Sequence, residues 1–362
     1  MRNLKDLFPA ELAGVAKSLG APAYRGRQIF RWLHARAAKT FEEMTDLPAE
    51  LRAELAQRFS TGYAPVILRQ EDPFDGTAKY LLRMADGAVV ETVRMEYRYG
   101  ASVCVSSQVG CRQGCIFCAS TIGGKERDLT AGEMIEEVLA VQRELPAGRR
   151  VHSVVVMGMG EPLENYDEVL RFVRLAHEPD GLHLSYRHLT VSTCGIVPGI
   201  DRLAGENLPI TLAVSLHAPN DELRNRLLPV NRRWPLAELM RAVRDYIART
   251  GRRVTFEYAM ILDTNDSPEH ARELAALLQG VLCHVNLIPL NPIQGSPLGA
   301  SPRQRIVEFR AILQSRGIPT TIRRQLGLAI EAACGQLRRR ELTGEAKARR
   351  LRGPLPVLPE RT

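Results

Sequence analysis

Three cysteines, Cys111, Cys115 and Cys118, lie within eight residues in a C-x₃-C-x₂-C pattern. A free thiol in a loop is prone to oxidation, so its presence there suggests a chemical task. Three thiolates are one fewer than a structural zinc ion takes. A [4Fe–4S] cluster also takes four ligands, so three cysteines would leave one iron open. The spacing therefore predicts a cluster whose open iron binds a small molecule directly.

Length and composition favour an ordinary cytoplasmic protein with a polyanionic partner. The chain has 362 residues, of which 45% are hydrophobic and 25% charged, which suits one large domain and a smaller one. The sequence has no apolar run long enough to span a bilayer and no signal-peptide core, so we expect no membrane association. Seven clustered cysteines suit a reducing compartment. A net charge of +8 and a pI near 9.3 favour binding to a polyanion.

The first part of the chain, residues 1–62, is expected to be a helical accessory domain. Apolar residues recur at helical spacing from Glu11 to Leu19, from Arg25 to Ala37 and from Pro48 to Phe59. The middle stretch carries several arginines. They form either a solvated helix face or a surface that binds RNA phosphates, and the sequence leaves both interpretations open.

A change to a period of two predicts a β-hairpin connector over residues 63–96. Its expected strands are Pro65–Arg69, Ala78–Met84 and Ala88–Tyr97, separated by Asp-Gly pairs that are typical of hairpin turns. Glu91 lies in the middle of the third strand. A carboxylate at such a position is most often exposed, so the pattern alone assigns it no role.

From residue 97 to 337 strands alternate with helices, which predicts an α/β fold: a partial TIM-like (β/α)₆ barrel. Thr130 and Glu133 form a capping box at the start of the first of these helices. The tail, residues 338–362, is basic and Pro-rich and is expected to be disordered. The expected strands are Val103–Ser107, Val151–Met157, His188–Ser192, Ile210–Ser215, Val254–Ile261, His284–Ile288 and Pro319–Arg323. The expected helices are Thr130–Glu144, Tyr166–His177, Leu236–Thr250, Ser267–Leu278 and Ser301–Arg316.

Polar and glycine-rich motifs follow the ends of these strands, where a parallel barrel carries its functional residues. Each motif alone is weak, because a polar residue at a strand end is often structural. Their concentration at one rim predicts a site. In chain order they are the cysteine loop, Gly158–Pro162, Ser192–Gly195, Ser215–His217, Asn291-Pro292 and Glu331–Leu337.

The cysteine pattern after one strand, with Gly160-Glu161-Pro162 after the next, resembles the radical S-adenosylmethionine (SAM) superfamily. That resemblance implies a [4Fe–4S] cluster held by three thiolates, with the amino and carboxylate groups of SAM on the open iron. More closely, the chain resembles the RlmN/Cfr family of RNA adenosine methyltransferases over most of its length. The motifs that carry this resemblance are Ser106-Ser107-Gln108, Gly158–Leu163, Leu216–Asn220 and Ala333–Leu337.

The family resemblance implies a role for each matching residue. The cluster ligands would be Cys111, Cys115 and Cys118, and SAM would contact Gly160, Glu161, Ser192, Ser215, Leu216, His217 and Asn291. Cys334 matches the cysteine that is itself methylated, Cys104 the second catalytic cysteine, and Glu91 the proton acceptor.

The resemblance also implies the reaction, which is methylation of adenosine C2 in 23S rRNA and in some tRNAs. That carbon has no lone pair and cannot attack a SAM methyl group, so two SAM molecules are expected per turnover. The first methylates Cys334, and the second yields a 5′-deoxyadenosyl radical that activates the S-methyl group to add to C2. After the adduct loses an electron, Glu91 takes the C2 proton, and Cys104 forms a transient disulfide with Cys334 to release the product. An external flavodoxin or ferredoxin system would supply electrons to a monomeric enzyme.

Alternative functions remain at this point. A Cfr-like enzyme methylates adenosine C8 and confers antibiotic resistance with the same catalytic residues, although the longer N-terminal module favours RlmN. Methylthiolation would not require both Cys104 and Cys334. A zinc-ribbon RNA-binding protein would use Cys104 with the three loop cysteines, but zinc explains neither the Gly-Glu-Pro motif nor Cys334.

The chain departs from the family pattern at Ala329, at Glu331, which is one methylene longer than the usual aspartate, and at Cys194. Ala329 replaces an acidic residue upstream of Cys334, which bears on substrate specificity more than on the chemistry. Cys194 stands where serine is usual, and Cys283 has no assigned role. We interpret both cysteines as small buried residues.

Overall fold

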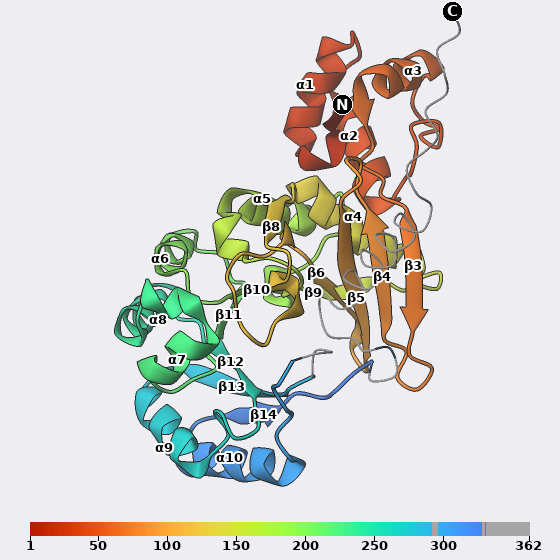
Figure 1. Ribbon diagram of the computed structural model, residues 1–362. Helices are drawn as coiled ribbons and strands as arrows, with labels where there is room; N and C mark the ends of the chain where they lie inside the picture. The colour runs from red at the N-terminus through yellow and green to blue at the C-terminus, as the bar shows by residue number, and fades with distance from the viewer. Residues whose placement is uncertain (292–295, 328–329, 331–362) are drawn as a thin grey trace, which may run out of the picture.

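The computed structural model describes residues 1–291, 296–327 and 330 (Figure 1). Cys334, Ala329, the Glu331–Leu337 motif and the tail 338–362 therefore lie outside the described residues. Within them, no helix is both long and apolar enough to cross a membrane.

A ten-stranded sheet in the order β14-β13-β12-β11-β10-β9-β6-β5-β4-β3 forms the body of the protein. The strands from β6 to β14 are parallel and curve into a partial barrel, which confirms the predicted fold class (Figure 1). The parallel strands are β6 (Gly100–Val105), β9 (Val151–Val156), β10 (Leu189–Thr193), β11 (Thr211–Ser215), β12 (Val254–Met260), β13 (Cys283–Pro289) and β14 (Thr320–Ile322).

Three antiparallel strands extend this sheet beyond β6. They are β3 (Val66–Glu71), β4 (Ala78–Arg83) and β5 (Val89–Tyr97), joined by turns at the two predicted Asp-Gly pairs. Because β5 pairs with β6, this hairpin segment forms one wall of the barrel rather than a detached connector.

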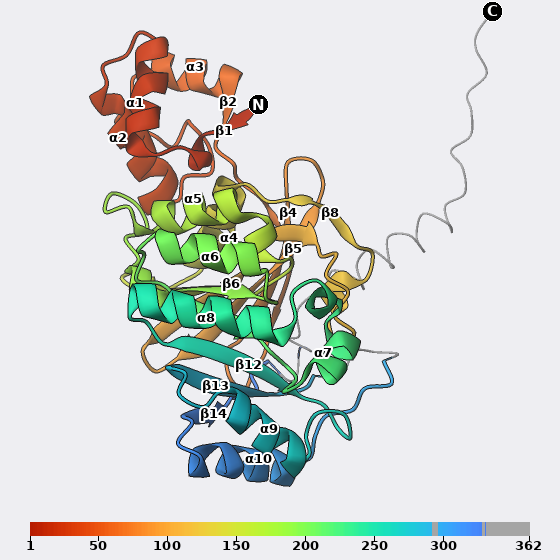
Figure 2. The same ribbon diagram turned by 90° about the vertical axis from the view of Figure 1, so that its left-hand side faces the viewer.

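Helices cover the outer face of the barrel (Figure 2). The capping box predicted at Thr130 is present, since its hydroxyl accepts from the Glu133 N–H at 3.2 Å and the Glu133 carboxylate accepts from the Thr130 N–H at 2.9 Å. Two helices were not predicted, α6 (Val197–Gly205) and α7 (Asp221–Leu227). The others are α4 (Ala131–Gln142), α5 (Tyr166–His177), α8 (Leu236–Thr250), α9 (Pro268–Leu277) and α10 (Arg303–Ser315).

The alternation of side chains along the strands explains why the barrel interior is hollow. In β11, Leu212 and Val214 belong to the hydrophobic core, whereas Thr211 and Ala213 line a cavity inside the barrel. Successive residues of a strand point to opposite faces, so the large apolar side chains pack under the helices. Small and polar side chains face inward and leave space for a ligand.

The N-terminal helices α1 (Pro9–Ser18), α2 (Tyr24–Phe30) and α3 (Ala49–Arg58) pack against the α4 side of the barrel (Figure 1). A fully buried ion pair joins Lys5 to Glu136 of α4. The carboxylate of Asp6 accepts a 2.7 Å hydrogen bond from the backbone N–H of Gly132 in the first turn of that helix, where N–H groups lack intrahelical partners. Both contacts fix the helical segment onto the barrel.

The arginines of the second predicted helix are partly committed to the fold. Arg27 and Arg31 both pair with Asp180, and Arg36 stacks on the Trp32 ring with its guanidinium carbon 4.2 Å from the ring centroid. Arg27 and Arg31 nevertheless keep 61% and 51% of their side chains exposed, so they can still approach a phosphate backbone.

Candidate active site

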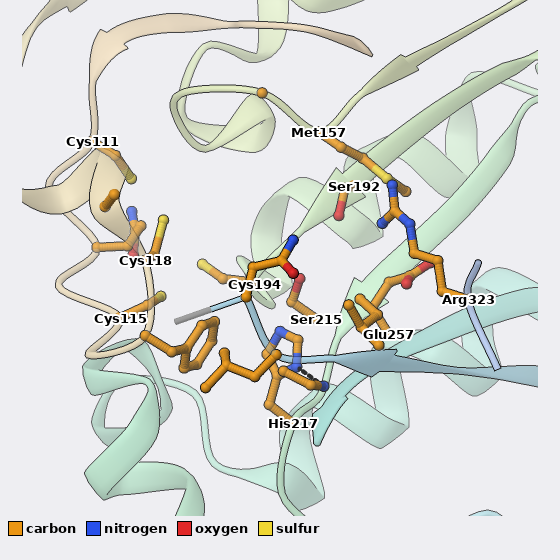
Figure 3. Close-up of a pocket in the computed structure, with 18 of the residues that line it drawn as sticks. Cys111, Cys115, Cys118, Met157, Ser192, Cys194, Ser215, His217, Glu257 and Arg323 are labelled. Atoms are coloured by element: carbon orange, nitrogen blue, oxygen red, sulfur yellow. Dashed lines mark hydrogen bonds between the residues drawn. The ribbon is translucent and has the colours of Figure 1, made fainter. Parts of the chain in front are cut away.

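A cavity of about 350 Å³ opens at the carboxyl ends of the parallel strands, which is the edge where the sequence motifs were expected to meet. The three loop cysteines lie along one side, with Ser192, Ser215 and His217 across from them (Figure 3). Nine predicted site residues line this cavity: Cys111, Cys115, Cys118, Gly160, Glu161, Ser192, Ser215, His217 and Asn291.

The cysteine loop follows β7 (Gln108–Gly110) and returns to β8 (Lys125–Asp128), and these two short strands pair with each other. Within the loop, the Cys111 N–H donates to the Gly124 carbonyl at 3.0 Å and the Cys118 N–H to the Cys115 carbonyl at 3.1 Å. Burial raises the pKa of Cys111 to about 12 and also raises the pKa of Cys115. The thiolate forms that bind iron therefore require the positive charge of the metal.

Within the described part of the chain, no three Cys, His, Asp or Glu side chains are close enough to hold one metal ion. A zinc ribbon needs four thiolates around a single ion. In a [4Fe–4S] cluster each thiolate binds a different iron, so its ligands do not converge on one point. Cys104, the fourth ligand of the zinc-ribbon alternative, lies on strand β6 rather than in the loop.

The segment from Gly158 to Glu161 packs directly against the backbone that precedes the cysteine loop. Gly160 has φ +103°, and an added Cβ atom would lie 2.6 Å from the Cβ of Gln108. At Gly158 an added Cβ would lie 2.8 Å from the Ser106 hydroxyl oxygen. Only glycine fits this approach, which brings Glu161 into the cavity.

Glu161 is a buried carboxylate held by backbone donors. One of its oxygens accepts from the Leu163 N–H at 2.9 Å, and the other accepts from the Cys194 N–H at 2.8 Å. Burial raises the pKa of Glu161, and these hydrogen bonds oppose the rise. A fixed, buried carboxylate in a cavity is suited to receive the ammonium group of a ligand.

His217 is held in an unusual backbone conformation with one ring nitrogen committed. Its φ is +56°, and its Nδ1 accepts a 2.9 Å hydrogen bond from the Ala259 N–H (Figure 3). Burial lowers the pKa of His217 to about 3, with a smaller contribution from Arg224. The imidazole is therefore neutral with its proton on Nε2, which can donate to a ligand.

Arg224 of α7 is fully buried and joins the ends of two barrel strands. Its guanidinium donates to the carbonyls of Cys194 at 2.6 Å, Leu216 at 3.1 Å and Ser215 at 3.1 Å, and to the Asn231 side chain at 2.7 Å. Burial lowers its pKa to about 10. The sequence motifs did not single out this residue, although it lies in the helix that Asn220 of the Leu216–Asn220 motif caps.

Leu216, one of the predicted SAM contacts, has its side chain in the hydrophobic core rather than at the cavity. Leu216 contributes through its backbone. Its N–H donates to the Glu257 carbonyl at 3.0 Å, and its own carbonyl accepts a hydrogen bond from Arg224. The residue thereby orients its neighbours Ser215 and His217 toward the cavity.

Glu91 and Cys104 lie on the wall formed by β5 and β6. Cys104 pairs directly with Val93, which lines the cavity together with Met95. Glu91 lies two residues from Val93, on the same face of β5. It is buried and forms an ion pair with Lys79 at 3.5 Å, which contradicts the exposed position that the strand pattern alone favours.

The sequence motifs did not identify several polar and flexible residues that also line the cavity, among them Thr77, Met157, Glu257 and Arg323. Within the described residues, the hydroxyl of Thr77 is buried without a hydrogen-bond partner, so it is available to a ligand. Glu257 accepts from Asn286 at 2.8 Å, and burial raises its pKa. The sequence did contain one sign of this residue, because Glu257 is the charged residue in the largely apolar strand β12.

These features fit SAM and an iron–sulfur cluster. The cavity lies within the size range of small-molecule pockets. It combines three thiols on one side with a glycine cradle, the buried Glu161 carboxylate for an ammonium group and the neutral His217 donor. A parallel partial barrel with this set of groups at its rim defines a radical SAM enzyme.

Comparison with known proteins extends this assignment. Residues 105–275 match the radical SAM superfamily, and residues 2–60 match the ribosomal RNA large subunit methyltransferase N-terminal domain. A probable dual-specificity RNA methyltransferase RlmN from Symbiobacterium thermophilum is 55% identical over 91% of this chain and 89% of its own length. The corresponding protein of Desulforamulus reducens is 50% identical over 93% of this chain and 96% of its own.

A crystal structure of a radical SAM methyltransferase from Sphaerobacter thermophilus superimposes with a TM-score of 0.90 and 50% identity. The superposition covers 93% of this chain and 99% of the Sphaerobacter thermophilus chain. The chain belongs to the RlmN family of SAM-dependent RNA methyltransferases.

Proposed function

We propose that the chain methylates C2 of an adenosine in 23S rRNA and of adenosines in some tRNAs, through an S-methylated Cys334 and a covalent protein–RNA adduct. The observation that carries this proposal is the pairing of Cys104 with Val93, a residue of the cavity wall. A cysteine outside the ligand loop but beside the reaction space suits a thiol that attacks an intermediate.

The cavity residues would hold SAM in a fixed orientation. Glu161 would accept a hydrogen bond from the ammonium group of SAM. The Nε2–H group of His217 would donate a hydrogen bond to a polar atom of SAM. Ser192, Ser215 and Asn291 offer further polar contacts around the same space. When bound with the cluster, SAM supplies both the methyl group and the radical that activates it.

Glu91 and Cys104 would act after the RNA base has been joined to the protein. Both lie on the inner face of adjacent strands, so a base that enters the cavity along this wall meets a carboxylate and a thiol together. Lys79 pairs with Glu91 at 3.5 Å and would hold the carboxylate in position on this wall.

Support for RNA as the substrate comes from the N-terminal segment and its relatives. Residues 2–60 match a domain described for ribosomal RNA methyltransferases, and this segment carries the exposed Arg27 and Arg31 beside Asp180. The same match favours an RlmN-type enzyme over a Cfr-like one, as do the names of the similar proteins.

Mass spectrometry of rRNA and tRNA from a strain that lacks the gene tests this proposal. We expect 2-methyladenosine to disappear from both RNAs and to return when the wild-type gene is restored, but not when the Cys334→Ala variant is supplied. Loss of 8-methyladenosine instead would establish the Cfr-like alternative. An unchanged content of both nucleosides would refute the proposed function.

A further inference from the structure

The outer side of the cysteine loop exposes aliphatic side chains. Ile116, between two of the cysteines that would bind the cluster, is 49% exposed, and Ile122 on the same loop is 48% exposed. An added Cβ atom at the adjacent Gly123 would meet nothing within 4 Å, so this side faces open solvent. Exposed apolar groups concentrated beside a functional centre are typical of a contact surface for another molecule.

Helix α7 and the turn that follows it lie against this loop, at the same end of the barrel (Figure 2). The Ile116 N–H donates to the Leu227 carbonyl at 3.2 Å, and an added Cβ at Gly114 would lie 3.5 Å from Pro229. The arginines of this neighbouring segment, Arg226, Arg232 and Arg233, are exposed. The loop and the segment therefore form one continuous surface.

The positive charge of this surface is only partly balanced by carboxylates, which are Glu164 beside Arg112 and Glu222 one helical turn before Arg226. No acidic side chain within the described residues forms an ion pair with Arg226, Arg232 or Arg233, whereas Arg241 on α8 pairs with both Asp201 and Asp245. Arg112, in the cysteine loop, pairs with Glu164 at 2.9 Å but keeps 66% of its side chain exposed. Exposed cations in excess over carboxylates around an apolar centre create a field that attracts an acidic partner.

We propose that this surface is where an acidic one-electron carrier protein, of the flavodoxin or ferredoxin type, docks to reduce the cluster. We call it the donor surface, and it consists of Arg112, Ile116, Ile122, Arg226, Arg232 and Arg233. The inference rests on the proposed function, since only the cluster requires such a partner. One electron leaves the reduced carrier and enters the cluster, and no atom is transferred.

Two physical arguments favour a protein carrier over RNA on this surface. Redox encounters use small interfaces that combine a limited apolar contact with electrostatic attraction, as the two isoleucines and their arginine neighbours provide. Surfaces that bind unpaired RNA present aromatic rings for base stacking. Here the neighbouring Trp234 is only partly exposed, and the Arg233 guanidinium carbon lies 4.5 Å from the centroid of its ring.

Stopped-flow reduction of the reconstituted holoenzyme tests the donor surface. Reduced flavodoxin is mixed anaerobically with the wild type, with the Arg226→Glu/Arg232→Glu variant, and with a matched Arg244→Glu/Arg249→Glu control on α8. We expect the second-order rate constant for cluster bleaching to fall roughly tenfold or more in the donor-surface variant at low salt, because the association rate of charged partners depends on electrostatic steering. The control variant should match the wild type. Added salt should shrink the difference.

Reduction by dithionite and binding of RNA distinguish a lost docking surface from a damaged cluster and from a lost RNA contact. We expect dithionite to bleach all three proteins at equal rates and to support equal RNA methylation, because a small reductant needs no docking surface. Equal flavodoxin rates in the donor-surface variant and the wild type would overturn the proposal. The proposal would also be overturned if dithionite reduced the cluster of the donor-surface variant as slowly as flavodoxin does. It would equally be overturned if that variant lost affinity for RNA while flavodoxin still reduced its cluster at the wild-type rate. RNA methylation by the dithionite-reduced wild type tests the proposed function separately.

Discussion

Val93 and Cys104 are directly paired across strands β5 and β6, so the Cys104 thiol shares a wall with a residue that lines the cavity. These two strands are antiparallel, although the rest of the barrel from β6 onward is parallel. The hairpin extension thus contributes side chains to the interior of the barrel. Glu91 reaches the same wall by the same route.

The Cys104→Ala variant should trap protein covalently bound to RNA, because the adduct can form but cannot be resolved by disulfide formation. Denaturing gel electrophoresis of the protein with labelled RNA would show the shifted species. Cys283→Ala, which removes a thiol buried in the core of β13, is the matched control and should release methylated RNA normally. Free product at the wild-type yield from Cys104→Ala would remove this residue from the scheme.

The Arg224→Leu variant should unfold more easily than the wild type. Its loss leaves the carbonyls of Cys194, Ser215 and Leu216 without their buried donor. Each buried acceptor left without its donor costs about 1–3 kcal/mol. Urea denaturation would measure the free energy of unfolding, and Arg224→Lys should recover only part of it because an ammonium lacks the planar fork. The exposed Arg226→Leu should change stability little; an equal loss there would contradict the role of burial.

The Gly160→Ala variant should weaken SAM binding at least tenfold, or about 1.4 kcal/mol. An added Cβ would lie 2.6 Å from Gln108, so the segment that carries Glu161 must shift. Gly251→Ala is the control, since Gly251 also has a positive φ, at +64°, but has nothing within 4 Å of an added Cβ. Calorimetric titration with SAM should find near-normal affinity in the control. Normal affinity in Gly160→Ala would show that the close approach does not position the ligand.

Stability should fall with rising pH through the titration of Glu137. This carboxyl is fully buried on α4, and desolvation raises its pKa well above 4.5, opposed by hydrogen bonds from Thr92 and Ser106. The folded state then holds a proton that the unfolded state has released. Its contribution is therefore complete below pH 4.5 and is lost as the pH rises through the folded pKa. The difference in unfolding free energy between wild type and Glu137→Gln, measured by urea titration from about pH 4 to 9, isolates this effect. A pH-independent difference would contradict it.

The predicted strand Val103–Ser107 shows where sequence periodicity reaches its limit. In the structure β6 ends at Val105. The Ser106 N–H leaves the sheet and donates instead to the Glu137 carboxylate at 3.0 and 3.1 Å. A tertiary hydrogen bond from a helix 31 residues away decides this boundary, and no local pattern records it.

The sequence by itself determined the alternation of strands and helices, the hairpin turns and the cysteine loop, because these depend on side-chain period and on turn residues close together in the chain. The motif resemblance also located nine of the residues that line the cavity. Only the tertiary structure decided that Glu91 is buried, that Leu216 contributes its backbone and that Arg224 joins the strand ends. Each of these depends on which residues distant in the chain become neighbours when the sheet closes, and burial then sets their charge and hydrogen bonding.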